Sequence, residues 1–259
     1  MLYQKRRLAR PWKSAECAAD SPPNAETAMT AFVLPAPPTP SVATAGSGER
    51  FAVRRIFCVG RNYAAHAREF GNDDRDPPFF FTKPADAVVD SGTDIPYPPL
   101  TENLHFEIEL VVAIGTSGFR ISRDKALDHV WGYGVGIDLT RRDLQDAAKK
   151  AARPWDWSKA FDRSAPCGPL VAARKSGHPA KGRIWLAVDG AVKQDADLAE
   201  LIWPVSDIVS ICSEGVELQA GDLIFTGTPA GVGAIKPGET ISGGVDGIGT
   251  IELTIGQRK

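Results

Sequence analysis

Short apolar segments bounded by turn-forming residues recur along the chain from residue 55 onward. Residues 56–59, 79–82, 184–188, 223–226 and 250–255 are mostly apolar, aromatic or β-branched, and Gly or Pro follows each of them closely. Such segments are typical of β-strands. The dipeptide Asp189-Gly190 after residues 184–188 predicts a hairpin whose second strand covers residues 191–194. Eleven glycines between Gly215 and Gly256 favour short strands and tight turns over helix.

Helical patterns are few. We expect helices at residues 62–70, at residues 140–152 and from about residue 206 to 212. The second has Thr140 as its predicted N-cap, Asp143 three residues later and Pro154 beyond its end. Because strands outnumber helices and do not alternate with them, the pattern predicts an α+β, mainly β fold rather than a doubly wound sheet.

The first 50 residues differ from the rest. They hold seven of the 20 prolines and show no sustained periodicity, so we expect residues 1–50 to be a flexible extension and residues 51–259 to be the domain in which any catalytic residues lie. Five basic residues between positions 5 and 13 would suit a transit peptide, but acidic residues follow closely. The simpler interpretation is that Met29 is the true start.

Composition excludes several classes of protein. The chain has 30 Lys and Arg against 32 Asp and Glu, a net charge of −2, whereas a nucleic-acid-binding protein needs a surplus of cations. No apolar run approaches the roughly 20 residues of a membrane-spanning helix. The four cysteines have no CxxC spacing, so we expect neither disulfides nor a zinc site, and we expect a cytoplasmic protein.

The strongest chemical signal is a pair of carboxylates in the apolar segment 107–114. Strand side chains alternate between faces, which places Glu107 and Glu109 on one face and four aliphatic side chains on the other. Burying two acids is costly unless a cation neutralises them, and hard divalent cations prefer oxygen ligands. Two alternatives remain open: the polar face meets water at a sheet edge, or Lys or Arg pairs with the acids.

A third acid strengthens the metal hypothesis. Asp138 ends the Gly-rich apolar segment 131–137, immediately before the predicted helix. Its alternative role is to cap that helix. With water and substrate oxygens, Glu107, Glu109 and Asp138 would complete an octahedral site for Mg²⁺ or Mn²⁺, with Ca²⁺ also possible. We expect these three acids to converge without a lysine among them.

Other residues could supply acid–base and anion-binding groups. His66 and Glu69 are three residues apart on a predicted helix, so the carboxylate could orient the imidazole as a general base; the pair could equally lie on a solvated face. Lys83 follows an aromatic strand and Lys159 lies in a Trp-rich segment, and either could be a surface lysine. Thr228 lies in a Gly-rich loop whose N–H groups could bind an anion.

Taken in chain order, these motifs resemble the fumarylacetoacetate hydrolase family over about residues 56 to 255. The resemblance is carried by Gly60-Arg-Asn-Tyr-x-x-His66-x-x-Glu69, Phe-x-Lys83-Pro84, Glu107-x-Glu109, Asp138 with Thr140-x-Arg142-Asp143, Lys159, and Gly227-Thr-Pro-x-Gly-Val-Gly233. It implies a mixed β-sandwich roll, usually a homodimer, with Mg²⁺ or Mn²⁺ held by Glu107, Glu109 and Asp138.

The resemblance also implies a reaction. It implies hydrolysis of the carbon–carbon bond of a 1,3-diketo acid such as fumarylpyruvate, as in the breakdown of aromatic compounds. In that case His66 and Glu69 activate water, and Lys83 and Lys159 assist the charged oxygens. The substrate contacts would come from Arg142, Gln145 and Thr228 at the 2-oxo-acid end and from Arg68 at the far carboxylate, with Arg61 and Arg153 as alternatives to Arg68.

Other functions stay open at this point. The same family fold would serve an acylpyruvate hydrolase, an oxaloacetate decarboxylase or an isomerase of a dienol diacid. A non-catalytic β-rich binding module that uses the acids structurally is a further alternative.

Overall fold

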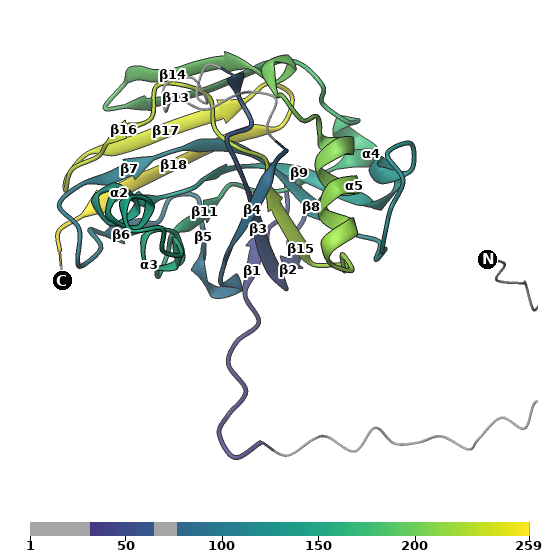
Figure 1. Cartoon of the computed structure of the whole chain (residues 1–259), viewed down its shortest axis with the longest axis horizontal. Coiled ribbons are helices and arrows are strands. Elements are labelled where there is room, and N and C mark those ends of the chain that lie inside the picture. The colour runs from purple at the N-terminus through teal and green to yellow at the C-terminus, as the bar shows by residue number, and fades with distance from the viewer. Residues whose placement is uncertain (1–31, 65–76, 259) are drawn as a thin grey trace, which may run out of the picture. The chain divides into compact units, whose positions relative to one another are not determined.

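The computed structural model describes residues 32–64 and 77–258, and the compact unit within it begins at Thr39. Strands dominate this unit (Figure 1). The mainly β fold predicted from the sequence is confirmed. Among the described residues, none of the helices is long and apolar enough to cross a bilayer.

The largest sheet forms the centre of the fold. It runs in the order β4 (Phe79–Lys83), β3 (Arg55–Gly60), β15 (Asp222–Phe225), β8 (Ile108–Ile114), β9 (Val130–Ile137), β11 (Ala165–Cys167) and β5 (Val88–Asp90), and β12 (Val171–Ala172) pairs with β9. A five-stranded sheet consists of β14 (Ala191–Asp197), β13 (Arg183–Val188), β17 (Thr240–Val245), β18 (Gly249–Gly256) and β6 (Asp94–Pro96). The predicted hairpin is therefore present as β13 and β14.

Two small sheets and a few helices complete the unit. The small sheets are β10 (Thr140–Arg141) with β7 (Leu104–Phe106) and β16 (Gly233–Ala234), and β1 (Ser41–Ala43) with β2 (Arg50–Ala52). The α-helices are α2 (Arg142–Lys150), α3 (Asp156–Lys159), α4 (Ala173–Ser176) and α5 (Val205–Gly215), and the 3₁₀-helices are η1 (Ala85–Ala87), η2 (Ala126–His129) and η3 (Leu198–Glu200).

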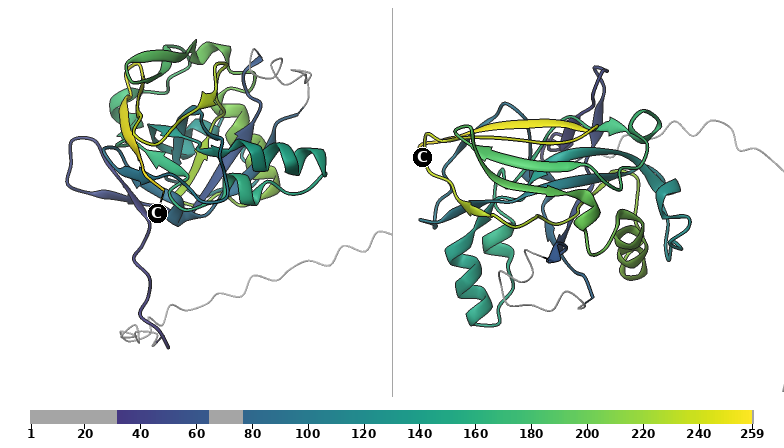
Figure 2. Two further views of the ribbon diagram at one scale, coloured as in Figure 1. Left: turned by 90° about the vertical axis from the view of Figure 1, so that its left-hand side faces the viewer. Right: turned by 90° about the horizontal axis from the view of Figure 1, so that it is seen from above.

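The two large sheets pack face to face (Figure 2), and every residue of strand β8 is buried. Alternate β8 side chains, Ile108 to Ile114, enter the main core, which the five-stranded sheet covers with residues such as Leu186 and Ile241. Val111 and Ala113, on the opposite face, enter a second core. The sheet-edge alternative for the acidic strand is therefore wrong, because β8 lies between β15 and β9.

Glu107 marks a break that the alternation pattern did not reveal. The predicted single strand is divided at this residue, since β7 pairs in the three-stranded sheet and β8 in the largest one. Glu107 still joins neighbouring backbone, because its carbonyl accepts the Asp138 N–H at 2.8 Å. The chain thus changes sheets at the first of the paired acids.

The predicted start of the second helix is wrong. Helix α2 begins at Arg142, and Thr140 belongs to strand β10 rather than capping a helix. The Thr140 hydroxyl accepts a hydrogen bond from Lys159 Nζ at 2.6 Å, so it is committed to a buried cation. The carboxylate of Asp143 accepts from the Thr101 hydroxyl at 2.6 Å and does not take part in a capping box.

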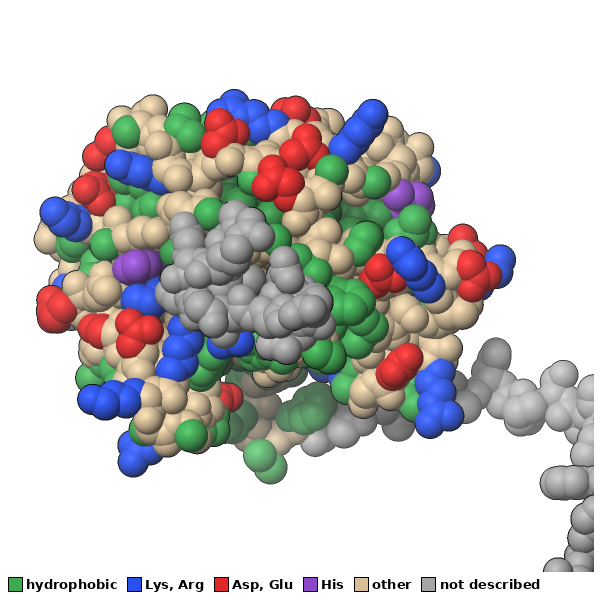
Figure 3. Space-filling view, turned by 45° about the horizontal axis from the view of Figure 1, so that its top comes forward, with side chains coloured by type: hydrophobic (Ala, Val, Ile, Leu, Met, Phe, Trp, Pro, Cys, Tyr) green, Lys and Arg blue, Asp and Glu red, His purple; other side chains and the backbone are tan. Residues whose placement is uncertain are grey.

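The folded unit begins earlier than the predicted boundary at residue 51. Strand β1 pairs with β2, and Val42 is fully buried in the second core. Ala45 N–H also donates to the Leu170 carbonyl at 2.8 Å. Basic and acidic side chains are interspersed on the face shown in Figure 3, in keeping with the near-zero net charge.

Candidate metal centre

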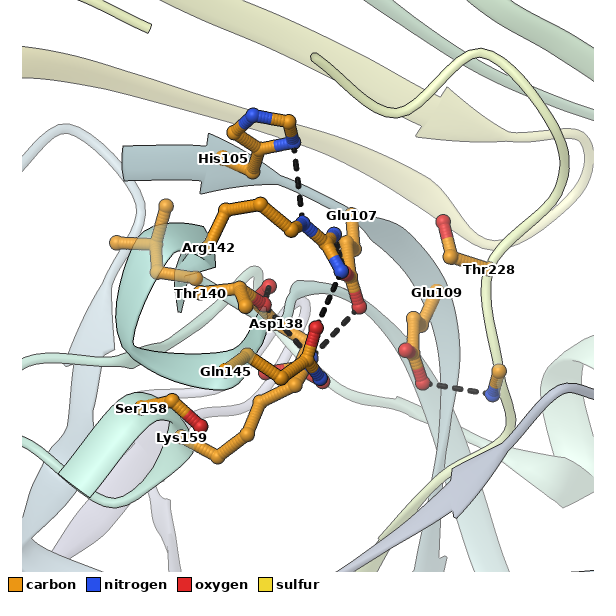
Figure 4. Close-up of polar contacts among 12 residues, drawn as sticks. His105, Glu107, Glu109, Asp138, Thr140, Arg142, Gln145, Ser158, Lys159 and Thr228 are labelled. Atoms are coloured by element: carbon orange, nitrogen blue, oxygen red, sulfur yellow. Dashed lines mark hydrogen bonds and ion pairs between the residues drawn. The ribbon is translucent and has the colours of Figure 1, made fainter. Parts of the chain in front are cut away.

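Three buried carboxylates meet where strand β8 begins and its neighbour β9 ends. Glu109 lies in β8, Glu107 just before it, and Asp138 directly after β9. One oxygen from each lies within 4.8 Å of the others, and their residues are at most 5% exposed. The structure thus brings together Glu107, Glu109 and Asp138, as the sequence predicts (Figure 4).

A lysine lies among these acids, contrary to the expectation from the sequence. Lys159 Nζ is 2.8 Å from Glu107 Oε2 and 2.6 Å from Asp138 Oδ2. Burial alone would lower the pKa of Lys159, but Asp138 and Glu107 outweigh it and raise the pKa above its ordinary value. The alternative in which a basic residue pairs with the acids is therefore realised for two of the three.

Lys83 contacts Asp138 without lining the cavity beside the acids. Its Nζ lies 2.8 Å from Asp138 Oδ1 and donates to the Leu139 carbonyl at 3.2 Å and to the Lys159 carbonyl. Two of its three ammonium donors therefore make hydrogen bonds to carbonyls, and the contact with Asp138 Oδ1 is an ion pair without hydrogen-bond geometry. Lys83 is also absent from the residues that line the cavity beside the acids, whereas Lys159 lines it.

Glu109 differs from the other two acids. Its Oε2 accepts the Gly227 N–H at 2.7 Å, and no ion pair to Glu109 occurs within the described part of the chain. Burial, followed by repulsion from Asp138 and Glu107, raises the pKa of Glu109 well above its ordinary value. A buried carboxylate without a cationic partner is a place where a bound cation would offset a large desolvation cost.

Gly227 is required at its position for two reasons. Its φ is +98°, and a Cβ added there would lie 2.7 Å from Asn62 Cβ. Asn62 is fully buried and its side chain donates to the Trp203 and Thr226 carbonyls at 3.0 and 2.8 Å. The loop that supplies the Glu109 hydrogen bond is therefore packed directly on the segment that begins the Gly60-Arg-Asn-Tyr motif.

Helix α2 provides the polar wall of the site. Arg142 donates through Nη2 to Glu107 Oε1 and through Nη1 to Gln145 Oε1. Both side chains line a cavity of about 40 Å³ together with the three acids, Lys159 and Thr228. Arg142, Gln145 and Thr228 thus line one cavity with the acids, and their role in binding substrate remains a prediction.

Two supporting residues were missed in the sequence. His105 Nδ1 accepts from Arg142 Nε at 3.3 Å, and its Nε2 lies 3.0 Å from Asn103 Oδ1. Burial and the neighbouring Arg142 lower the pKa of His105 to about 4, which keeps the ring neutral and able to accept this bond. The signal was present, because His105 precedes Glu107 and Glu109 at the same two-residue spacing.

Gln194 is the second missed residue, and its sequence context gives no hint of a role. It is fully buried in β14 and donates through Nε2 to Thr228 Oγ1 and the Pro229 carbonyl, both at 2.8 Å. Its Oε1 accepts the Ile108 N–H at 3.0 Å. Gln194 thereby fixes the Thr228 loop against the start of β8.

Three predicted site residues lie outside the described residues. These are His66, Glu69 and Arg68. Their roles remain predictions. Arg61 and Arg153, the alternatives to Arg68, are both described and line a cavity of about 610 Å³. Lys159, Phe79 and Trp155 line both this outer cavity and the smaller one beside the acids.

The buried carboxylate triad lines a cavity within a mainly β fold, an arrangement typical of the metal centre of an enzyme. Comparison with known proteins identifies the family. The model of the fumarylacetoacetate hydrolase C-terminal domain matches residues 55–256. The chain belongs to the fumarylacetoacetate hydrolase family. The enzyme class predicted from the sequence, a hydrolase acting on carbon–carbon bonds, is confirmed.

Individual relatives differ in what they are named for. A fumarylpyruvate hydrolase from a Ralstonia species is 46% identical over 178 residues, which cover 69% of this chain and 92% of that protein. The human mitochondrial oxaloacetate tautomerase FAHD1 is 38% identical over 195 residues, covering 75% and 88%. The crystal structure of fumarylpyruvate hydrolase from Pseudomonas aeruginosa with Mn²⁺ and pyruvate is 51% identical, covers 88% of this chain and all of that one, and superposes with a TM-score of 0.86.

Proposed function

We propose that this protein hydrolyses fumarylpyruvate to fumarate and pyruvate. The observation that carries the proposal is the buried triad of Glu107, Glu109 and Asp138 in a chain 51% identical to a fumarylpyruvate hydrolase whose structure contains Mn²⁺ and pyruvate. In the reaction, water adds its oxygen to the carbonyl carbon at the fumaryl end. The carbon–carbon bond then breaks, its electron pair stays with the pyruvate fragment as an enolate, and a proton on carbon completes pyruvate.

The triad fits a divalent cation, and we propose Mg²⁺ or Mn²⁺. Three cationic side chains, Lys83, Lys159 and Arg142, contact Glu107 and Asp138, whereas Glu109 has no ion pair among the described residues. A bound Mg²⁺ or Mn²⁺ would supply a Lewis acid for the 2-oxo-acid end of the substrate. A divalent ion added to this balanced set leaves a surplus of two positive charges, which suits a carboxylate together with an enolate oxygen.

The remaining roles belong to the chain's own side chains. Arg142 and Gln145 are held side by side on α2, where a planar guanidinium can bind a carboxylate through two hydrogen bonds. Thr228, whose hydroxyl is fixed by Gln194, lines the same cavity. We propose that the positive charge of Lys159, which lines the cavity, stabilises the developing negative charge, while Lys83 keeps Asp138 in place.

We propose that His66 removes the proton from the attacking water and that Glu69 orients its imidazole. The support for this pair is the Gly60-Arg-Asn-Tyr-x-x-His-x-x-Glu motif. Replacing His66 by Ala is expected to lower kcat by about 10²–10⁴-fold, the usual cost of losing a general base. Full hydrolysis at neutral pH by this variant would move the role to another residue.

The test of the proposed function is a substrate panel. Purified protein is loaded with Mg²⁺ or Mn²⁺ and assayed with fumarylpyruvate, acetylpyruvate and oxaloacetate, and the three kcat/KM values are compared. We expect fumarylpyruvate to be preferred and activity to disappear with a chelator and return with metal. A higher kcat/KM for oxaloacetate would instead favour the second candidate, oxaloacetate tautomerisation or decarboxylation, which the 38% identity to the human tautomerase supports.

Several broader expectations stay predictions. They are the homodimer, the cytoplasmic location and a place in the breakdown of aromatic compounds. Light scattering of the purified protein would test the first of these.

A further inference from the structure

We infer that Arg61 and Lys149 form a subsite for the second carboxylate of a dicarboxylic substrate. The inference rests on the proposed function and deepens it. The acids, Arg142 and Gln145 occupy the inner end of the site, so a substrate held there by its 2-oxo-acid end must extend toward the outer cavity. The far end of the substrate would therefore contact the residues that line the passage between the two cavities.

Lys149 reaches this passage from the same helix that carries the inner contacts. Arg142, Gln145 and Lys149 are spaced i, i+3 and i+7 on α2, which places them along one helical face. All three line the inner cavity, and Lys149 is half-buried, with its Nζ 5.3 Å from the centroid of the Trp155 ring. Burial, followed by repulsion from Arg142, lowers the pKa of Lys149; Asp146, whose Oδ1 lies 3.9 Å from Lys149 Nζ, acts in the opposite direction, and Arg61 adds to the repulsion. An additional negative charge would be stabilised here.

Arg61 reaches the passage from a different element. It follows strand β3 with a φ of +61°, an uncommon left-handed conformation for a residue with a side chain, and its guanidinium carbon lies 5.4 Å from the centroid of the Phe79 ring. Arg61 forms no ion pair with any other residue that the structure describes. It lines both the inner and the outer cavity.

An aromatic pair connects the two cations. The Phe79 and Trp155 rings meet edge to face, with centroids 5.3 Å apart. Arg61 therefore lies over one ring and Lys149 over the other, so two aromatic rings and two cations border the passage. The flat unsaturated carbons of a fumaryl group suit the rings, and its terminal carboxylate suits the cations. Acetylpyruvate ends in a methyl group, which cannot form an ion pair or a hydrogen bond with these cations.

The test compares two substrates that differ at the far end. Arg61→Met and Lys149→Met keep an unbranched side chain but remove the charge. Each is expected to lower kcat/KM for fumarylpyruvate by about 10–100-fold, the range for losing a hydrogen bond to a charged group, while kcat/KM for acetylpyruvate changes by less than about twofold. Inhibition by fumarate should weaken in parallel, whereas inhibition by crotonate, which has a methyl group in place of one carboxylate, should not.

Two control variants match the changes in charge. Lys150→Met removes the next lysine of α2, which is exposed and lines neither cavity. Arg120→Met removes an exposed arginine that also has a left-handed φ, +51°, and lies over a neighbouring phenylalanine, Phe119. Neither control is expected to change the ratio of the two kcat/KM values.

Two outcomes would overturn the subsite. Equal losses on both substrates would mean that Arg61 and Lys149 support the structure only. A selective loss in Arg68→Met, with Arg61→Met and Lys149→Met unaffected, would assign the far carboxylate to Arg68. Failure of the proposed function is recognised separately, because the unmodified protein would then not prefer fumarylpyruvate.

Discussion

At the residue scale, the acidic site residues could be predicted because the free-energy cost of burying a charge makes them exceptions in an apolar segment. Glu107 and Glu109 interrupt an otherwise apolar strand, and such an exception requires a compensating cation. The compensation itself could not be predicted, since Lys159 comes from a short helix more than twenty residues beyond Asp138. The local sequence pattern thus indicates which charged groups need a partner, whereas the tertiary fold determines which residue pairs with them.

Glu109 gives the first residue-scale prediction. Glu109→Gln keeps an acceptor for the Gly227 N–H but removes the unpaired charge, so we expect metal affinity to fall at least about 100-fold while the metal-free protein melts at the same or a higher temperature. Titration calorimetry and thermal unfolding measure the two effects. Glu102→Gln, at an exposed acid paired with Arg258, serves as the control. Unchanged metal affinity in Glu109→Gln would remove Glu109 from the ligand set.

His105 gives the second. Because its Nδ1 accepts from Arg142 Nε, His105→Ala should leave the guanidinium less constrained and raise KM for the 2-oxo acid by about tenfold, with a smaller change in kcat. In His105→Asn the amide oxygen can occupy the place of Nδ1, and KM is expected to recover most of the way. A loss of similar size in kcat alone, or no rescue by Asn, would argue against a positioning role.

At the scale of elements, the regular strands and the hairpin followed from alternation and turn chemistry, but boundaries next to the site did not. Thr140 has the residue type and spacing of an N-cap, yet its hydroxyl binds Lys159 and the residue stays in a strand. The division of the acidic strand at Glu107 has the same origin. In both places a contact with a distant residue outweighs a local preference.

The loop around Gly227 provides the element-scale prediction. Gly227→Ala should destabilise the fold by about 2–4 kcal/mol, because it combines a left-handed backbone with a clash against Asn62. Gly238→Ala isolates the first effect, since Gly238 has a φ of +92° with no atom within 4 Å of an added Cβ, and should cost about 1 kcal/mol. Chemical denaturation measures both. Equal costs would show that the Asn62 contact is relieved easily.

At the scale of the whole molecule, the sequence indicated the mainly β class but placed the start of the folded unit too late. The proline-rich composition of the first 50 residues hides Val42, the one buried position among the described residues 32–50, which packs in the second core. One residue among many small and polar ones gives no periodic signal, so its burial could not be read from the pattern.

Truncation tests this boundary. Removing residues 1–38 should leave the melting temperature of the remaining chain within about 2 °C, because the compact unit begins at Thr39. Removing residues 1–53 also deletes β1, β2 and the buried Val42 and Val53, and should lower the melting temperature by about 5–10 °C. If the longer truncation melted like the shorter one, the first two strands would contribute nothing measurable.

Burial of β8 on both faces has a consequence for the opening fluctuations of the protein. Amide hydrogens in this strand, and in β9 beside it, can exchange with solvent only when both cores open, so they should be among the slowest in the molecule. Glu109 lies within that strand and Asp138 directly follows its neighbour. A cation bound between them would therefore slow exchange at the most protected positions of the chain, and local fluctuation at the surface would not release it.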